Sequence, residues 1–342
     1  MRRPVRLALI AATILILGIG GYTLFWRIAA GRIEDGAAEW AAAARAQGIA
    51  ASWQTLSVGG YPFSFRVELT GARLASAPPN LAGELTAPRL VATVRAANLH
   101  AATLTAPEGL SLSGEKLVSL KAGAAVGTVT AGTKGGAAVW LQLTGVTANA
   151  AALPGAPAAA KTAQLWLDLP AAPPKTHTDR NIGVAVDLAG LSVPLAPEAL
   201  GTTIDEAALG LTVIGPVPPG TPRQAAAGWR DDGGTLELDH LHLGWGGLDL
   251  DASGTMALDR DLQPEGSLSG SLGGYDKLLA ALVSAGQIKG SDASRLKLVL
   301  GFLAKPGADG QPRLPAALTL QNGILSMGPI TFGRVPRIDW GK

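Results

Sequence analysis

The chain has 342 residues and a net charge of +2, with 28 lysines and arginines against 26 aspartates and glutamates. Only 16% of the residues are charged and 47% are hydrophobic, which excludes disorder driven by charge, and 45 glycines and 23 prolines punctuate the sequence. Cysteine is absent, which excludes disulfides, thiolate metal sites and a cysteine nucleophile.

The N-terminus carries the first clear element. Residues 1–6 are a basic tip, and residues 7–26 are uncharged and rich in Leu, Ile and Ala. Twenty such residues in a helix are long enough to cross a bilayer core of about 30 Å. Tyr22 and Trp26 stand where an interfacial aromatic belt would lie. The stretch 7–26 is therefore predicted to be a transmembrane signal-anchor.

A cleaved secretory signal peptide is the alternative interpretation of the same stretch. Ala29, Ala30 and Gly31 provide small residues of the kind found at cleavage sites. The bulky pair Phe25 and Trp26 just before them fits that interpretation poorly. The anchor is the favoured prediction, and cleavage remains open.

Arginines set the predicted orientation. Arg2, Arg3 and Arg6 precede the apolar stretch and only Arg27 follows it directly, so the N-terminus is expected in the cytoplasm and the rest in the periplasm, anchored in the inner membrane. These four arginines account for the positive net charge, because residues 1–30 hold no acidic residue. The exported part is slightly acidic and has no basic cluster, so nucleic acid is not an expected partner.

Two further patterns follow the anchor. Residues 27–48 are rich in alanine and end in glycine, which predicts a helical stalk with Gly48 at its C-cap. A period of two then begins, with Phe63, Phe65 and Val67 alternating with polar residues as in a half-buried strand. The same alternation recurs at 164–169, 182–188, 209–213, 236–238, 241–245, 248–250 and 318–320.

Many short alternating runs broken by Gly and Pro predict a mainly β, β-rich α+β fold, built as an extended antiparallel sheet with a groove or as a sandwich. Between 236 and 245 the apolar phase slips at Asp239 and His240, which predicts a β-bulge. Proline-rich stretches at 153–157, 170–174 and 216–222 are predicted to be loops or linkers. The first two favour a division into an N-terminal half, 49–160, and a C-terminal half, 161–342.

The C-terminal half carries two local signals. Leucines at helical spacing over 275–285 and 293–304 predict a helical hairpin within 275–304, with Ser291 and Asp292 as the N-cap of its second helix. Asn322–Gly323 between two apolar runs predicts a tight β-hairpin.

Few residues suggest chemistry. His240 and His242 have the spacing of two ligands on one strand face, near Asp239, Asp249 and Asp251, but a tight metal site needs three or four placed ligands. A solvated strand face is therefore favoured, and no metal or cofactor is predicted. No Walker loop, nucleophile elbow or zinc-protease motif occurs in the sequence. We expect no catalytic residues and no enzymatic activity.

The apolar strand faces must nevertheless be covered. A sheet can fold over on itself and close, or it can leave a groove for an apolar guest such as a lipid tail. Both possibilities remain open at this point.

One set of motifs resembles a known family. Trp53, the run Gly59–Phe65, and the stretch from Trp229 through Trp245 to Gly266 resemble the bacterial "domain of unknown function 2125" family. The resemblance implies an anchored periplasmic protein without an assigned activity. Its marked residues, expected to be structural rather than functional, are Trp53, Tyr61, Pro62, Phe63, Phe65, Trp229 and Trp245.

The overall pattern also looks like AsmA-type envelope proteins, to which lipid-handling β-sheet grooves are attributed. This second resemblance implies binding or shielding of lipid or another apolar envelope component. A scaffold that binds other envelope proteins, without a small ligand, is the alternative.

Overall fold

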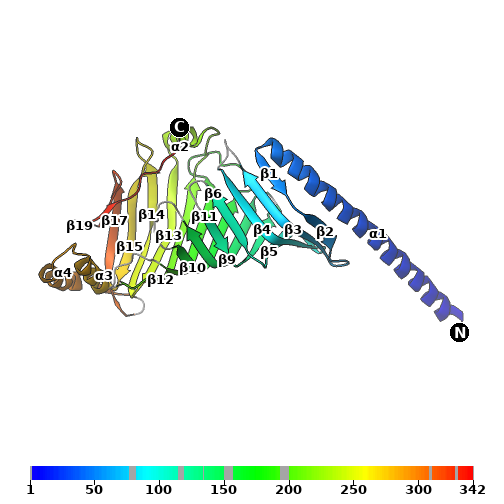
Figure 1. Cartoon of the computed structure of the whole chain (residues 1–342), viewed down its shortest axis with the longest axis horizontal. Helices are drawn as coiled ribbons and strands as arrows, with labels where there is room; N and C mark the ends of the chain where they lie inside the picture. Colours follow the sequence, from blue (N-terminus) through cyan, green and yellow to red (C-terminus); the bar gives the residue numbers. More distant parts are fainter. Residues whose placement is uncertain are drawn as a thin grey trace. The chain divides into compact units, whose positions relative to one another are not determined.

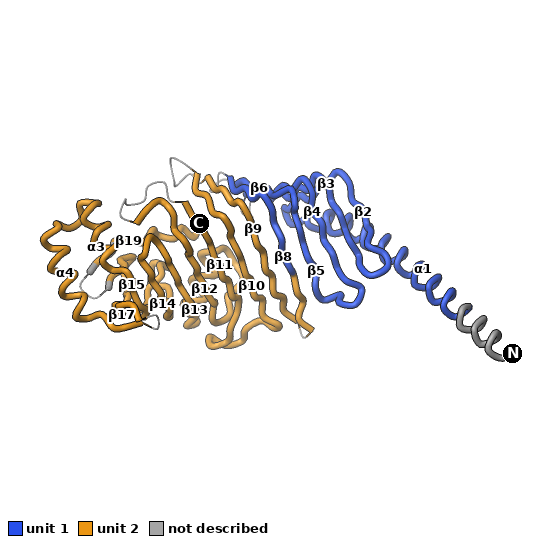
Figure 2. Tube along the Cα trace, turned by 90° about the horizontal axis from the view of Figure 1, so that it is seen from below, with its two compact units in different colours: residues 1–128 blue, residues 129–342 orange. Residues whose placement is uncertain are grey.

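The computed structural model describes residues 2–76, 82–114, 119–133, 135–149, 157–192, 200–307, 310–327 and 330–341. Residues 1–128 and 129–342 form two compact units (Figure 2). The predicted division at 160 and 161 lies inside the continuous strand β10, and most of the first proline-rich stretch lies outside the described residues. The mainly β fold with an N-terminal apolar helix, antiparallel sheet and C-terminal helices is confirmed.

The first unit begins with a single long helix. The predicted anchor and stalk are one continuous helix, α1 (Arg2–Ala46), which is about 68 Å long at 1.5 Å per residue. Gly48 follows it in the left-handed conformation with φ of 78°. Residues 13–46 of α1 are long and apolar enough to cross a membrane, although a signal sequence would meet the same criteria.

A small antiparallel sheet follows α1. β1 and β2 both pair with β3, which pairs with β4, and β4 pairs with both β5 and β6. The strand predicted from the alternation is confirmed as β3, but it begins at Ser64. Phe63 was predicted on its buried face and instead lies in the preceding turn, where it is exposed. Figure 1 shows the C-terminal part of α1 beside β1 and β2. The strands are β1 (Ile49–Ser52), β2 (Thr55–Gly59), β3 (Ser64–Ser76), β4 (Gly83–Arg95), β5 (Asn98–Ala106), β6 (Leu110–Gly114), β7 (Ser119–Ala122) and β8 (Ala124–Ala131), the last ending in the second unit.

In the second unit, strands adjacent in sequence pair antiparallel from β9 to β15, and β15 then pairs with β17. The predicted bulge is confirmed, because the register between β13 and β14 shifts between Leu238 and Leu241. The strands are β9 (Ala137–Asn149), β10 (Ala158–Leu169), β11 (Arg180–Ser192), β12 (Thr203–Ile214), β13 (Thr235–Trp245), β14 (Leu248–Leu258), β15 (Pro264–Gly273), β16 (Lys305–Pro306), β17 (Pro312–Gln321), β18 (Ile324–Met327) and β19 (Ile330–Arg334).

The Asn322–Gly323 hairpin is also confirmed. It joins β17 to β18, and both turn residues have positive φ, as the tight turn requires. The unit's core lies on one sheet face, with Leu238, Leu268 and Leu318 buried together.

The helical hairpin is confirmed as α3 (Tyr275–Ser284) and α4 (Gly290–Leu303), with a correction at the start of α4. Its N-cap is Lys289, in an extended conformation, so the predicted caps Ser291 and Asp292 lie in the first turn instead. Asp292 there favours the helix by its charge near the positive end of the helix dipole.

One helix was not predicted. α2 (Pro222–Asp231) begins inside a stretch that its prolines assign to a loop. Thr221 caps it, Pro222 occupies its first turn and Gln224 completes a capping box. This threonine, proline and glutamine pattern is the sequence signal that would have predicted the helix.

Candidate functional site

An apolar groove lies in the first unit between α1 and the sheet. Its volume is about 590 Å³, within the range of about 300–1,000 Å³ usual for small-molecule sites. Helix α1 contributes Phe25, Ile28 and Ile33 among others, and the sheet contributes residues of β3, β4 and the start of β5. Arg32 is the single charged residue of the lining.

Strand alternation builds the floor of the groove. Phe65 lies opposite Val94, and Val67 lies opposite Ala92, in the register of β3 and β4. All four line the groove, because residues two apart on a strand share a face. Such cross-strand pairs form a continuous apolar surface.

The Gly60–Ser64 turn, which joins β2 to β3, packs against α1. The Tyr22 hydroxyl donates to the Pro62 carbonyl, and the Thr23 and Tyr61 hydroxyls are 2.7 Å apart. The Trp26 indole N–H donates to the Ser64 carbonyl at 3.2 Å. Contacts from three residues within about one turn of α1 thus hold the Gly60–Ser64 turn.

Aromatic rings complete this contact. Trp26 stacks on Phe65, with ring centroids 5.6 Å apart and planes 6° apart, and meets Tyr61 edge-on at the same distance. Trp26, Ala30 and Phe65 form a buried cluster against which Ile33 packs. The docking of α1 on the sheet therefore rests on the aromatic residues of the predicted motif.

Glycine is required at the start of the turn. Gly60 has φ of 98°, and a Cβ there would lie 2.8 Å from the Ser64 carbonyl oxygen. That oxygen is the acceptor of the Trp26 indole, so a side chain at residue 60 would disturb the same contact. The Tyr61–Pro62 peptide bond is cis.

The motif residues of the first unit divide by exposure. Phe65 is buried, whereas Phe63 is 81% exposed and Tyr61 is 45% exposed. Pro62 is half-buried. Trp53 is half-buried in the loop between β1 and β2 and is not part of the groove lining.

The other two motif tryptophans lie in the second unit. Trp229 on α2 is buried, and its indole N–H donates to the Ile214 carbonyl at 2.8 Å. It also lines a second apolar cavity of about 360 Å³, together with Met256 and Trp340. Trp245 ends β13 and donates to the Gly201 carbonyl at 3.0 Å.

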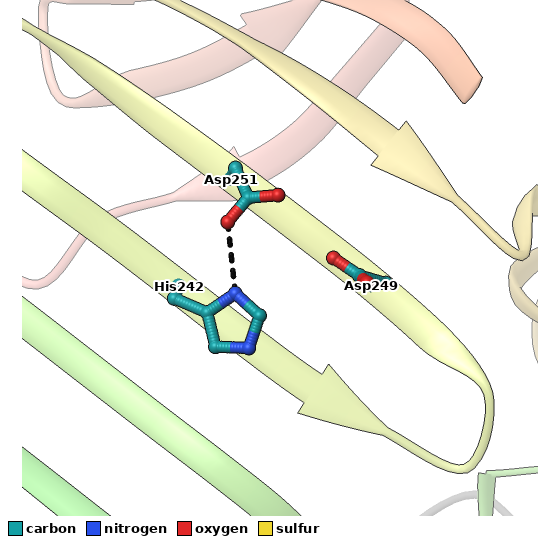
Figure 3. Close-up of side chains that lie close together, drawn as sticks. All are labelled: His242, Asp249 and Asp251. Carbon is teal, nitrogen blue, oxygen red and sulfur yellow. Dashed lines mark hydrogen bonds and ion pairs between the residues drawn. The ribbon is translucent and has the colours of Figure 1, made fainter. Parts of the chain in front are cut away.

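His240 and His242, the predicted histidine pair on β13, make different contacts. His242 binds Asp251 with Nδ1 and a carboxylate oxygen 2.8 Å apart (Figure 3). Asp249 lies beside them, and one possible ligand atom from each of the three residues falls within 4.8 Å of the others. His240 instead lies over Gly210 of β12, where a Cβ would overlap its ring.

Arg313 already pairs with both carboxylates of this cluster. Its guanidinium lies 2.5 Å from Asp249 and 2.7 Å from Asp251. Partial burial raises the pKa of Asp251, but hydrogen bonds from His242 and Arg313 outweigh burial and hold that pKa below its ordinary value. The hydrogen bond to Asp251 in turn raises the pKa of Arg313. A metal ion would have to displace this arginine, which makes the cluster a poor cation site.

Comparison with protein families gives one result. A family model described as an uncharacterized protein conserved in bacteria (DUF2125) matches residues 26–336. The chain belongs to the DUF2125 family. The resemblance carried by the Gly59–Phe65 run and the tryptophans is thus confirmed, and the match includes the whole sheet floor of the groove. Comparison of this DUF2125 protein with curated proteins and with solved structures gave no match.

Proposed function

We propose that this DUF2125 protein is a single-pass inner-membrane protein whose periplasmic domain binds or shields a lipid acyl chain, without catalysing a reaction. The observation that carries the proposal is the groove of about 590 Å³, whose one wall is the helix long and apolar enough to cross a membrane. A lipid leaving the bilayer along α1 would meet this groove first.

The docking of α1 supports an uncleaved anchor. A cut at the small residues 29–31 would remove Trp26, which is buried against Phe65 and bonded to Ser64. Phe65 would then lose its stacked partner. Arg2, Arg3 and Arg6 before the helix favour a cytoplasmic N-terminus by the positive-inside rule.

The lining supports a lipid more than a polar ligand. The walls are aliphatic and aromatic, and Arg32 is exposed with no ion pair among the described residues. A guanidinium at the edge of an apolar groove suits the phosphate of an anionic head group. We therefore expect anionic phospholipids to bind in preference to zwitterionic ones.

The test is photo-crosslinking of the full chain in nanodiscs that contain phospholipids with a diazirine in the acyl chain. We expect labelling of peptides from α1, β3 and β4. Ala92→Phe places a ring in the groove and should reduce labelling several-fold. Thr93→Phe is the matched control, because residue 93 faces the opposite side of β4.

Three results would contradict the proposal. Equal labelling of the two variants, or labelling that avoids the groove peptides, would show that the groove holds no lipid. An intact mass corresponding to a chain that begins after residue 31 would show that the helix is a cleaved signal peptide. Loss of the preference for anionic lipids in Arg32→Gln would support the role of the guanidinium.

The second candidate function, a protein-interaction scaffold, is favoured by the surface of α4. None of its residues is buried, and Leu298, Val299, Phe302 and Leu303 are exposed, with Phe302 at 90%. An apolar surface of this kind commonly marks a protein contact. Crosslinking from Phe302 that traps one stoichiometric protein, together with no lipid labelling of the groove, would favour the scaffold.

A further inference from the structure

The mouth of the groove is bordered by exposed apolar side chains. We name the three aromatic residues Phe25, Tyr61 and Phe63, together with the neighbouring Leu99, the aromatic rim. All four side chains are exposed. Phe25 and Leu99 also line the groove. The backbone N–H of Ala96, in the turn before β5, donates to the Phe63 carbonyl at 3.0 Å, which holds the two turns of the rim together.

We propose that the aromatic rim inserts into the lipid interface of the membrane that α1 crosses, so that the groove opens directly onto the acyl chains of the periplasmic leaflet. This inference rests on the proposed anchor. The partner surface is the bilayer itself, rather than a protein.

Helix contacts place the rim at membrane depth. Tyr22 and Thr23 bond to Pro62 and Tyr61, so the turn lies level with residues inside the apolar stretch 7–26. Trp26 at the end of that stretch is only about 5 Å further along the helix axis. Each interfacial layer of a bilayer is about 5–8 Å thick. If residues 7–26 span the core, the turn therefore lies at the outer edge of the core, within about 5 Å of the interface.

Side-chain chemistry suits that position. No charged residue occurs from Gly59 to Ser64, and tyrosine and other aromatic rings are favoured at membrane interfaces. Cationic side chains flank the turn: Arg27 follows Trp26, and Arg95 pairs in register with Ser64. Neither arginine has an ion pair among the described residues, so both are available for lipid phosphates.

The experiment uses the absence of cysteine, since a single introduced thiol can be labelled in the otherwise native full chain. In the Phe63→Cys variant the introduced thiol is labelled with a bimane fluorophore. The labelled protein is reconstituted into liposomes that contain lipids with a nitroxide at a shallow or a deep acyl position. Ala50→Cys is the control. It is exposed on β1 and pairs with Ala75, about 35 Å along β3 from Ser64.

We expect shallow nitroxides to quench the fluorophore at position 63 several-fold more than the one at position 50. Ile16→Cys, in the middle of the apolar stretch, reports on the anchor and should be quenched most by deep nitroxides. Leu99→Cys repeats the rim measurement if the protein labelled at 63 fails to fold.

The other outcomes contradict the inference that the aromatic rim inserts into the membrane interface. Quenching at 16 without quenching at 63 and 99 would overturn the inference while leaving the anchor intact. No quenching at 16 would overturn both. A disulfide-linked dimer of Phe63→Cys at native yield, with no quenching, would identify a second copy as the partner and also overturn it. Failure of lipid labelling in the groove leaves the rim measurement unaffected, so the two proposals fail separately.

Discussion

Trp26→Ala tests the physical basis of the helix docking. Trp26 is 9% exposed, stacks on Phe65 and donates to the Ser64 carbonyl. Truncating a buried tryptophan costs about 3–5 kcal/mol, because it removes apolar contact and leaves a cavity. We therefore expect the contact between α1 and the turn to be weakened by at least about 3 kcal/mol.

Hydrogen exchange of the full chain in nanodiscs measures this loss. A decrease of about 3 kcal/mol in the free energy of local opening corresponds to exchange faster by about 100-fold or more in peptides spanning residues 59–66. Trp40→Ala is the matched control, because Trp40 lies on the same helix and is 55% exposed. It should change the opening free energy by about 0.5 kcal/mol or less.

A double-mutant cycle isolates the ring contact. Trp26→Ala combined with Phe65→Ala should show a coupling energy of about 0.5–1.5 kcal/mol beyond additivity, as expected for an aromatic pair. If Trp26→Ala exchanges no faster than Trp40→Ala, the turn does not depend on the helix, and the reasoning that places the turn at membrane depth is refuted.

Three further predictions concern the second unit, each measured as the urea dependence of unfolding. Gly270→Ala should destabilise the protein by about 1–3 kcal/mol, because its Cβ would overlap the Asp251 carbonyl oxygen. The control is Gly290→Ala, in open space at the start of α4, which should change stability by about 0.5 kcal/mol or less. Equal effects of the two substitutions would contradict the packing argument. Trp229→Phe should cost about 1–3 kcal/mol, since the buried Ile214 carbonyl loses its donor, and an unchanged midpoint would mean that water replaces the indole. Asp251→Asn should reduce the acid sensitivity of unfolding, because the pKa of Asp251 is lowered in the folded state. A lowered folded-state pKa contributes stability that is complete above the ordinary carboxyl pKa of about 3.9 and is lost as the pH falls through the lowered value. An unchanged pH profile would count against the contacts of Asp251 with Arg313 and His242.

The groove and the rim give the marked aromatic residues distinct roles. Phe65 forms the floor of the groove and is buried, whereas Phe63, two residues earlier on the same run, faces outward. Tyr61 joins both, since it contacts Trp26 and is also half exposed. The short run Gly59–Phe65 thus docks the helix, shapes the groove and presents the rim.

Sequence patterns by themselves determined the elements whose signals are local. The apolar stretch 7–26, the alternation through Phe65 and Val67, the phase slip at Asp239 and the Asn322–Gly323 turn each correspond to the element expected. Helix and strand periodicities and tight-turn chemistry depend only on residues that are close in the chain, so these elements can be predicted from a single sequence. The capping box of α2 is an equally local signal, but the prolines of residues 216–222 predict a loop at the same place.

Only the tertiary structure decided which of these residues meet. Tyr22 contacts Pro62 across 40 positions, and Arg313 reaches Asp251 across 62. No periodicity encodes such pairs, because they arise when a helix docks on a sheet or when strands distant in sequence pair. Because of such long-range contacts, the predicted anchor helix and the aromatic motif together line one groove. The carboxylates of the possible metal cluster are likewise paired with an arginine that lies far from them in the sequence.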